Sequence, residues 1–260
     1  GLGFNVNAEE CQKITESNVS TYFAIDYSDI QYCSGTQNLQ NNGCFPLTIA
    51  SILKSYGLDY KPTDISSYLC EHYKSDAQNT TYSTIIIAHD VKDTFNMDIE
   101  KIDESMSAID EALDSNKSVL ASVGNTSIFT KRSHYIGIVM KSNDSYYIIN
   151  TGSKNNASIT SGWYSKESVQ KNVVDSLNMG MWSIMPRDCS NATNSSATTS
   201  SNNNSEHSPS EDPYPGAGPN LSTDDEVKCN KIFKKNGSDE FNDLGQFLQD
   251  LFLGIRLLAP

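Results

Sequence analysis

Two apolar runs joined by a short polar turn constrain the fold of this chain more than any other feature. Residues 135–140 (Tyr-Ile-Gly-Ile-Val-Met) and 146–149 (Tyr-Tyr-Ile-Ile) are rich in β-branched and aromatic side chains, and Lys-Ser-Asn-Asp-Ser lies between them. Such a pattern predicts an antiparallel β-hairpin. A hairpin brings the start of its first strand beside the end of its second, so residues at these two positions are expected to lie side by side.

His134 lies at the start of the first strand, predicted over 133–140, and Asn150 at the end of the second, predicted over 146–150. An amide beside an imidazole can hold the ring in one tautomer, as the third member of a Cys-His-Asn arrangement does. The other histidines are weaker candidates for a functional role. His72 and His207 lie in polar surroundings typical of surface residues, and His89 follows an apolar run on a predicted helix. We therefore predict that His134 is the functional histidine and that Asn150 orients it.

A base of this kind needs a nucleophile, and Cys44 is the candidate. Apolar residues recur at helical spacing over 47–53, Pro46 fits the first turn of a helix, and Gly57 is a natural stop. Cys44 then lies at the N-terminus of a buried helix, where the partial positive charge favours a thiolate, and Gly43 permits a close backbone approach. The alternative is a buried structural cysteine at a helix start.

Several short motifs stand in a fixed order along residues 22–186: Tyr-Phe-Ala-Ile-Asp-Tyr at 22–27, Tyr-Cys-Ser-Gly at 32–35, Asn-Gly-Cys-Phe-Pro-Leu-Thr-Ile-Ala at 42–50, Lys-Ser-Val at 117–119, Ser-His-Tyr-Ile at 133–136 and Gly-Trp-Tyr at 162–164. In this order they resemble a secreted bacterial papain-like cysteine peptidase family, related to the double-glycine leader (bacteriocin-processing) peptidases. The resemblance implies a papain-like fold and thiol-dependent hydrolysis of peptide or amide bonds. It implies Cys44, His134 and Asn150 as catalytic residues.

Candidate substrate-binding residues are Gly43, Ser133 and Trp163. For Trp163, packing in the core is an equal alternative.

The chain departs from this family at the oxyanion site. Relatives that share the first motif carry a glutamine whose side chain donates to the oxyanion, and this chain has Ala24 there. Losing one such donor typically lowers the rate by about 10²–10³. Gln31, Gln37 or Gln40 can be considered as substitutes, and weak or absent activity is the other possibility.

A second departure lies at the residue that orients the histidine. Many relatives have Asp followed by Pro where this chain has Asn150, which can also orient a histidine. An alignment shifted by one residue would place Thr151 there, a poorer partner.

The remaining periodicity places helices before the sheet. Further helices are predicted over 62–70, 82–95 and 105–116, and further strands over 97–102, 119–123 and 181–185. The expected fold class is α+β and papain-like, with N-terminal helices packed on a C-terminal antiparallel sheet. A disordered linker and a C-terminal amphipathic helix are expected to follow.

The composition changes after Arg187, and three segments are predicted from it. Residues 1–187 form the peptidase domain. Residues 188–224 form a linker rich in Asn, Ser and Pro, with too few apolar residues to fold. Residues 225–260 carry an apolar helical stripe over 241–258, which must bury its face against the body, a partner or a membrane interface.

The net charge and the arrangement of possible metal-ligating residues limit what this chain is expected to bind. The net charge of −13 argues against binding to nucleic acid. No cluster of His and Cys suggests a metal site, and no cofactor is expected. The expected substrate is a peptide, a protein or the peptide of the cell wall.

The six cysteines bear directly on Cys44. If Cys44 is a nucleophile it stays reduced, and the remaining five form at most two internal bridges. Candidate pairs are Cys11–Cys33 and Cys189–Cys229. The competing possibility is three structural disulfides that include Cys44, which would abolish the enzyme.

The chain starts Gly-Leu-Gly without a signal peptide and ends within an apolar stretch. We expect an extracytoplasmic protein, secreted or anchored at the cell surface by a membrane segment after residue 260. Two rivals to a peptidase stay open. One is a catalytically weak or inactive papain-like module that binds a surface partner, and the other is an acyl transferase with the same triad.

Overall fold

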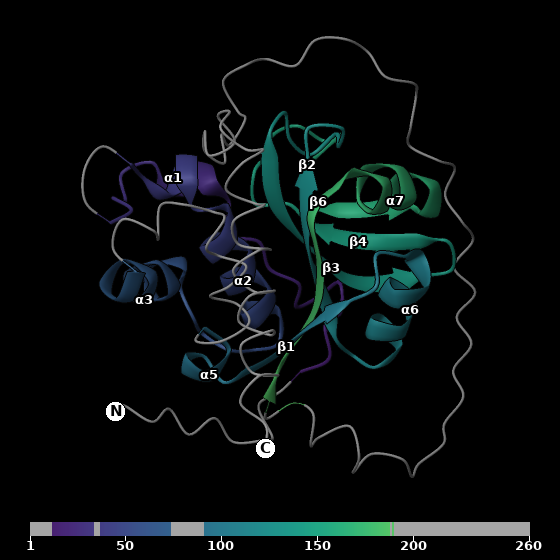
Figure 1. Cartoon of the computed structure of the whole chain (residues 1–260), viewed down its shortest axis with the longest axis horizontal. Helices are drawn as coiled ribbons and strands as arrows, with labels where there is room; N and C mark the ends of the chain where they lie inside the picture. Colours follow the sequence, from purple (N-terminus) through teal and green to yellow (C-terminus); the bar gives the residue numbers. More distant parts are fainter. Residues whose placement is uncertain (1–11, 34–36, 74–90, 188, 190–260) are drawn as a thin grey trace, which may run out of the picture. The chain divides into compact units, whose positions relative to one another are not determined.

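The computed structural model describes residues 12–33, 37–73, 91–187 and 189 (Figure 1). It divides into two units, residues 1–230 and 231–260, and every described residue belongs to the first. The predicted linker, the C-terminal helix over 241–258, most of the predicted helix over 82–95, and two of the histidines, His89 and His207, lie outside the described residues.

The helix expected after Cys44 is present as α2 (Cys44–Ser55), with Gly43 as its N-cap. Pro46 occupies its third position, where no intrahelical hydrogen bond is lost. The helix ends before Gly57, whose φ of +91° lies in the left-handed region. The other helical elements are η2 (Ala24–Tyr27), α1 (Leu39–Asn42), α3 (Pro62–Tyr73), α5 (Lys92–Thr94), α6 (Met106–Asp114), α7 (Lys166–Asn172) and η5 (Val174–Ser176).

The strands form one antiparallel sheet in the order β1-β6-β2-β3-β4-β5. Their bounds are β1 (Met97–Ile102), β2 (Ser118–Gly124), β3 (Ser133–Ser142), β4 (Ser145–Ile149), β5 (Gly162–Ser165) and β6 (Leu177–Pro186). The predicted hairpin is β3–β4, in which Gly137 pairs with Ile149 and Ser142 with Ser145. The α+β class with an antiparallel sheet is confirmed. The elements from η2 to α5 precede the sheet, whereas α6 and α7 lie between strands.

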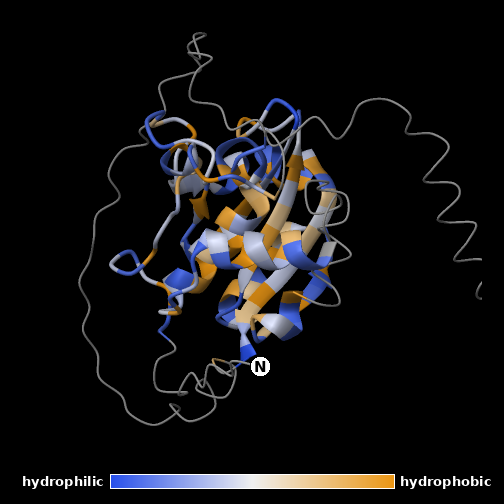
Figure 2. Cartoon of the chain, turned by 90° about the vertical axis from the view of Figure 1, so that its left-hand side faces the viewer, coloured by the Kyte–Doolittle hydropathy of each residue, from blue (hydrophilic) through white to orange (hydrophobic). Residues whose placement is uncertain are grey.

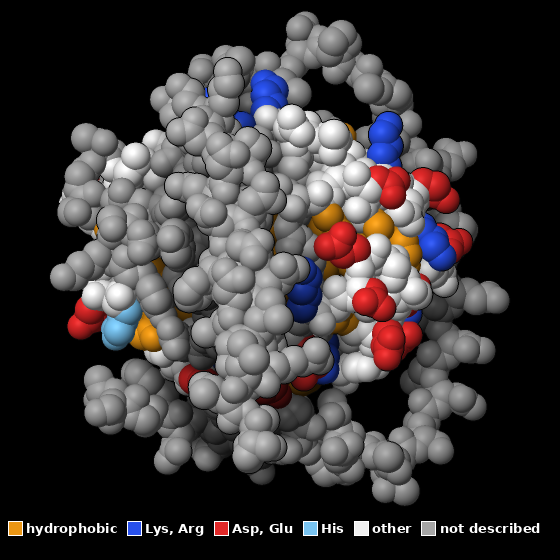
Figure 3. Space-filling model, viewed as in Figure 1, with side chains coloured by type: hydrophobic (Ala, Val, Ile, Leu, Met, Phe, Trp, Pro, Cys, Tyr) orange, Lys and Arg blue, Asp and Glu red, His pale blue; other side chains and the backbone are white. Residues whose placement is uncertain are grey.

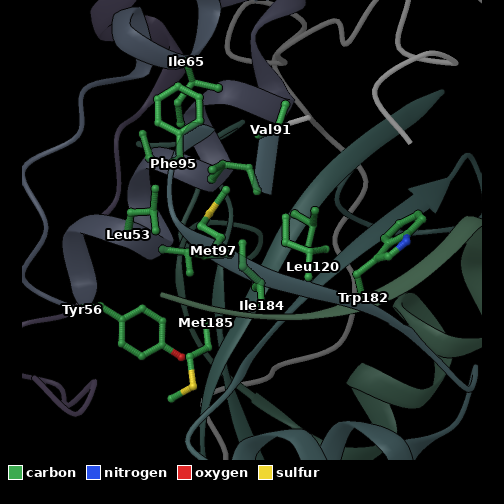
Figure 4. Close-up of a cluster of buried hydrophobic side chains, with 14 of the residues drawn as sticks. Leu53, Tyr56, Ile65, Val91, Phe95, Met97, Leu120, Trp182, Ile184 and Met185 are labelled. Atoms are coloured by element: carbon green, nitrogen blue, oxygen red, sulfur yellow. The ribbon is translucent and has the colours of Figure 1, made fainter. Parts of the chain in front are cut away.

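Helices cover both faces of the sheet (Figure 1). On one face α2 packs on β3, and α3 packs on α2; on the other, α6 contacts β2 and β3 while α7 contacts β4 and β5. Each face has its own apolar core, because side chains alternate along each strand. Figure 4 shows the core on the α2 side, where Leu53, Phe95 and Trp182 approach from helix and sheet. Figure 2 shows the hydrophobic residues gathered in this interior.

The edge strand β5 and the helix α7 are among the elements that were not predicted. We expected Trp163 and Tyr164 only to cover the end of the sheet, but both are in β5, paired with Tyr147 and Tyr146. Four residues are too few to show alternation. Ser165 then caps α7 by accepting a hydrogen bond from the Ser168 N–H, a local signal that the sequence does contain.

One predicted disulfide is wrong. Cys33 pairs with Cys70 of α3, not with Cys11, and their Cα atoms are 5.0 Å apart. Spacing along the chain suggested the nearer cysteine, but the packing of α3 beside the segment before α1 decides the pair. Connectivity of this kind depends on tertiary contacts.

The described surface carries charges of both signs. Figure 3 shows Asp and Glu side chains interspersed with Lys and Arg on the side that carries α6 and α7. Within the described ranges no helix is long and apolar enough to cross a membrane. The same ranges hold no group of three or more His, Cys, Asp or Glu side chains suited to a metal ion.

Candidate functional site

The hairpin brings His134 and Asn150 together, as its pattern predicted. His134 is the second residue of β3 and Asn150 is the first residue after β4. His134 Nε2 and Asn150 Oδ1 are 2.7 Å apart, and both residues are buried. Thr151, the partner in the shifted alignment, is not the residue that contacts the ring in this way.

The contacts of the Asn150 amide fix which of its atoms faces the imidazole. Its oxygen also accepts from the Gly152 N–H at 2.9 Å, and its nitrogen donates to the main-chain oxygen of Ile159. The oxygen therefore faces Nε2, and since a carbonyl oxygen only accepts, Nε2 carries the proton. In the neutral ring the basic lone pair then lies on Nδ1, the tautomer that a general base toward a thiol needs.

Two residues that the sequence analysis passed over hold this pair. A Cβ atom on Gly152 would lie 3.1 Å from both Asn150 Oδ1 and His134 Nε2, so only glycine leaves room beside the hydrogen bond. Ser161 Oγ accepts a hydrogen bond from the Asn150 N–H at 2.9 Å, and it accepts a second one from the Thr21 hydroxyl. The glycine after a predicted strand end was visible in the sequence, but its neighbours were not.

Burial makes His134 a weak base in this structure. The ring is 1% exposed, and the loss of solvent lowers the pKa of His134 to about 4, although the Asn150 hydrogen bond acts in the opposite direction. His134 is therefore neutral at pH 7. A neighbouring anion would raise this pKa, because it would stabilise the imidazolium.

Side-chain contacts hold the N-terminal part of α2 against the start of β3. Thr48 donates its hydroxyl to the main-chain oxygen of Tyr135 at 3.0 Å, and the Phe45 ring meets the Tyr135 ring edge to face at 5.3 Å. Cys44 and His134 are the residues next to this ring pair along their elements. The first turn of α2 and the first residues of β3 thus belong to one packed unit.

The thiol state expected for Cys44 is not the one observed. Cys44 is disulfide-bonded, as are Cys33, Cys70 and Cys189, and no described cysteine is free. The expectation of a reduced Cys44 is therefore wrong for this structure, in which Cys44 is in a disulfide as the competing possibility required. A sulfur held in a disulfide has no thiolate to attack with. Cys44 is also 1% exposed.

Ala24 lies beside the site, at the start of η2. It is fully buried, and its N–H donates to the main-chain oxygen of Thr151, next to Asn150, at 2.9 Å. The methyl side chain cannot donate, and its N–H has a partner. The position that resembles the oxyanion glutamine therefore supplies no donor. Of the substitutes considered, Gln31 is exposed and forms a bridge with Asn38.

Asn42 is a residue that the sequence did not single out. It ends α1, two positions before Cys44, and is 3% exposed. Neither its amide nitrogen nor its amide oxygen has a hydrogen-bond partner within the described part of the chain. Leaving a buried polar group unpaired costs about 1–3 kcal/mol, so a native fold seldom keeps one without a reason.

Two of the candidate substrate-binding residues have structural partners. A Cβ on Gly43 would lie 2.5 Å from the main-chain oxygen of Leu39, so glycine is required where α1 turns directly into α2. Ser133 Oγ accepts a hydrogen bond from Asn178 Nδ2 at 3.1 Å. The close backbone approach expected at Gly43 is thus made within the chain.

Trp163 lies elsewhere. Its ring packs edge to face on Tyr147 at 5.6 Å and lines a cavity of about 420 Å³ with Tyr56 and Met140. The residues lining this cavity include none of Cys44, His134 and Asn150. The structure therefore does not bring Trp163 together with the other candidate residues.

Comparison with known proteins gives one structural likeness to report. No family model matches the chain, and no curated protein matches it. Among solved structures it is similar to the peptidase domain of Streptococcus ComA, a bi-functional ABC transporter involved in a quorum-sensing pathway. That match has 20% identity and a TM-score of 0.39, and it covers 60% of this chain and 96% of that one.

Proposed function

We propose that this chain is a papain-like cysteine peptidase or amidase whose nucleophile, Cys44, acts after an external dithiol has reduced its disulfide by thiol–disulfide exchange and has itself become a disulfide. The observation that carries the proposal is the buried His134–Asn150 pair, held in the tautomer that leaves Nδ1 basic. A buried histidine whose pKa is lowered costs stability below its ordinary pKa, so it is unusual as a packing device. The order of motifs along residues 22–186 supports the same function.

In the proposed reaction the Cys44 thiol gives its proton to His134 Nδ1, and the thiolate attacks the carbonyl carbon of the scissile bond. The carbon–sulfur bond forms as the carbonyl π electrons move to oxygen. His134 then returns the proton to the leaving amine, and water hydrolyses the thioester by the reverse proton path. Asn150 keeps the ring oriented, and the Cys44 N–H, in the first turn of α2, donates to the oxyanion.

The disulfides support a location outside the cytoplasm, since such bonds persist in oxidising compartments. We propose a secreted or surface-anchored protein that acts on a peptide, a protein or cell-wall peptide. The described structure, with Cys44 oxidised and buried, is then the resting form.

A second function is favoured by two observations. Cys44 is in a disulfide, and Ala24 supplies no oxyanion donor. Both fit a module of the same fold that binds a partner and has lost catalysis. It differs from the first proposal in one measurable property, the reactivity of the reduced Cys44 sulfur.

The test is alkylation after mild reduction. The whole chain is reduced with dithiothreitol, treated with iodoacetamide at pH 6, and digested for mass spectrometry. We expect Cys44 to be modified at least tenfold faster than Cys33 and Cys70, the ordinary thiols released in the same sample, and His134→Ala to remove the difference. Hydrolysis of casein or a peptidoglycan digest should be lost in Cys44→Ala.

Equal labelling of the three sulfurs, with no hydrolysis that depends on Cys44, would overturn the peptidase and leave the binding module. Retained hydrolysis in Cys44→Ala would place any activity elsewhere in the chain. Added amine nucleophiles that capture the acyl group in preference to water would identify an acyl transferase.

A further inference from the structure

The proposed peptidase lacks a second oxyanion donor at the position where its resemblance places one. Ala24 has no donor in its side chain, and its N–H is bonded to the main-chain oxygen of Thr151. A single N–H from the start of α2 is a weak oxyanion site, because each donor typically contributes about 10²–10³ in rate. A donor of different origin is therefore required for the proposed chemistry.

The Asn42 amide is the unused donor nearest to Cys44 along the chain. Its side chain is buried, and both amide atoms lack partners among the described residues. Its main-chain N–H donates to Asn38, and the next N–H, that of Gly43, donates to Leu39 at 2.8 Å. The main-chain N–H groups of Asn42 and Gly43 are thus satisfied, whereas the Asn42 side chain keeps unmet hydrogen-bonding capacity.

The local fold brings the element that ends at Asn42 into contact with two others. Helix α1, which ends at Asn42, contacts η2, which begins at Ala24, and α2, which begins at Cys44. A Cβ on Gly43 would meet the main-chain oxygen of Leu39, so glycine is required between Asn42 and Cys44.

An independent observation marks the same region as a place for a polar ligand. Besides Asn42, the buried side-chain atoms without partners in the described ranges are the hydroxyls of Ser122, Thr151 and Ser153. The last two lie on the loop after Asn150, which meets η2 through the Ala24–Thr151 bond and an ion pair between Lys154 and Asp26 at 2.8 Å. Unmet polar groups therefore flank η2 on both sides.

We propose that the Asn42 side-chain amide is the second oxyanion donor of this enzyme and replaces the glutamine that Ala24 lacks. This inference rests on the proposed function. Nδ2 donates one hydrogen bond, and the Cys44 N–H the other, to the oxygen that becomes negative when the carbon–sulfur bond forms. Oδ1 accepts an N–H from the substrate, so a peptide, which offers both a carbonyl and amide N–H groups, satisfies both atoms of Asn42.

The decisive variants are Asn42→Ala and Asn42→Leu. Both remove the donor, and Leu keeps a similar volume in the buried site. We expect hydrolysis to fall by about 10²–10³, mainly in kcat. Iodoacetamide labelling of Cys44 at pH 6 involves no oxyanion, and it should be unchanged.

The neighbouring residue gives a matched control. Asn41 is exposed, and its contact with Asn38 is made through its main-chain N–H, so Asn41→Ala should retain full hydrolysis. The Tm of Asn42→Leu is expected to equal or exceed that of the natural protein, because an unpaired amide has been removed from the interior.

The outcomes separate the two proposals. Unchanged hydrolysis in Asn42→Leu overturns the role of Asn42 while the peptidase stands. A parallel loss of labelling and Tm shows a structural role and also overturns it. A natural protein that hydrolyses no peptide overturns the proposed function and with it the oxyanion inference, whether the labelling of Cys44 is fast or slow.

Discussion

The two halves of the candidate site differ in how complete they are. On the imidazole side, around His134 and Asn150, every polar contact of the Asn150 amide is made within the chain. On the sulfur side, Cys44 is in a disulfide, and the adjacent Asn42 has two amide atoms without partners in the described part of the chain. Folding therefore completes the contacts of the imidazole side, and the proposed function assigns the unmet groups of the sulfur side to a substrate.

This difference follows from the elements that carry each half. In a hairpin inside a six-stranded sheet, the neighbouring strands satisfy the backbone hydrogen bonds. The strand register then fixes where the residues at the strand ends lie. A helix N-terminus leaves its first N–H groups without intrahelical acceptors, so it keeps unmet hydrogen-bonding capacity unless a ligand arrives. Under the proposed function, folding alone positions the imidazole, whereas the N–H groups at the start of α2 find an acceptor only when a substrate binds.

The largest expected effect comes from replacing His134 on the imidazole side of the site. His134→Ala takes away the proton acceptor, and hydrolysis by the reduced protein should fall by about 10²–10⁴. The measurement is the initial rate of peptide cleavage. His72→Ala is the control: its ring stacks on Tyr68 at 4.1 Å at an exposed site, and it should have no effect. A rate that survives in His134→Ala would remove the imidazole from the mechanism.

The next effect is the pH dependence of stability in the oxidised protein. The pKa of His134 is lowered to about 4 in the fold, against about 6.5 when unfolded, so the unfolded chain binds one more proton between these values. Stability is therefore retained above pH 6.5 and lost as the pH falls toward 4, by up to about 3 kcal/mol. Urea unfolding across this range measures it.

His134→Gln provides the reference for that measurement, since it removes the titrating group and leaves the carboxylates unchanged. The natural protein should lose more stability than this variant between pH 7 and pH 4. Parallel curves for the two proteins would contradict the neutral, buried state of His134.

A smaller effect is expected from placing a methyl group beside the hydrogen bond between His134 and Asn150. Gly152→Ala places a methyl group 3.1 Å from His134 Nε2 and Asn150 Oδ1, which displaces one of them by a few tenths of an ångström. We expect roughly a tenfold loss of hydrolysis and of Cys44 labelling at pH 6. At Gly162 a Cβ meets no atom within 4 Å, so Gly162→Ala is the matched control and should match the natural protein.

The smallest effect concerns the support of Asn150. Ser161→Ala removes the hydroxyl that accepts from the Asn150 N–H and from Thr21, and stability should fall by about 1 kcal/mol. Denaturant unfolding of the oxidised chain measures this change. A loss above about 3 kcal/mol would mean that Ser161 holds more of the fold than this one strand end.

Much of the architecture could be predicted because its signals are local. The apolar period over 47–53 and the stop at Gly57 predicted α2, and the runs before and after the polar turn predicted β3 and β4. β5 was missed because a four-residue edge strand has no readable period. The partner of Cys33 was predicted wrongly because pairing depends on which helices pack together.

The site was predictable to the same extent. His134 and Asn150 flank a hairpin, so their proximity follows from local sequence, and the hydrogen bond between them agrees with it. Gly152, Ser161 and Asn42 could not be identified, because their importance lies in contacts with residues distant in sequence or in the lack of such contacts. The catalytic roles themselves stay predictions.

The sequence by itself determined the helix that begins at Cys44, the hairpin that begins at His134, and therefore which chemical groups stand at the element ends, because hydrophobic period and turn residues act over short distances. Only the tertiary structure decided that Cys44 is oxidised, that Ala24 has a bonded N–H, and that the Asn42 amide is buried without a partner. The physical reason is that oxidation, burial and hydrogen-bond satisfaction depend on what surrounds a residue in space, which its neighbours along the chain do not specify.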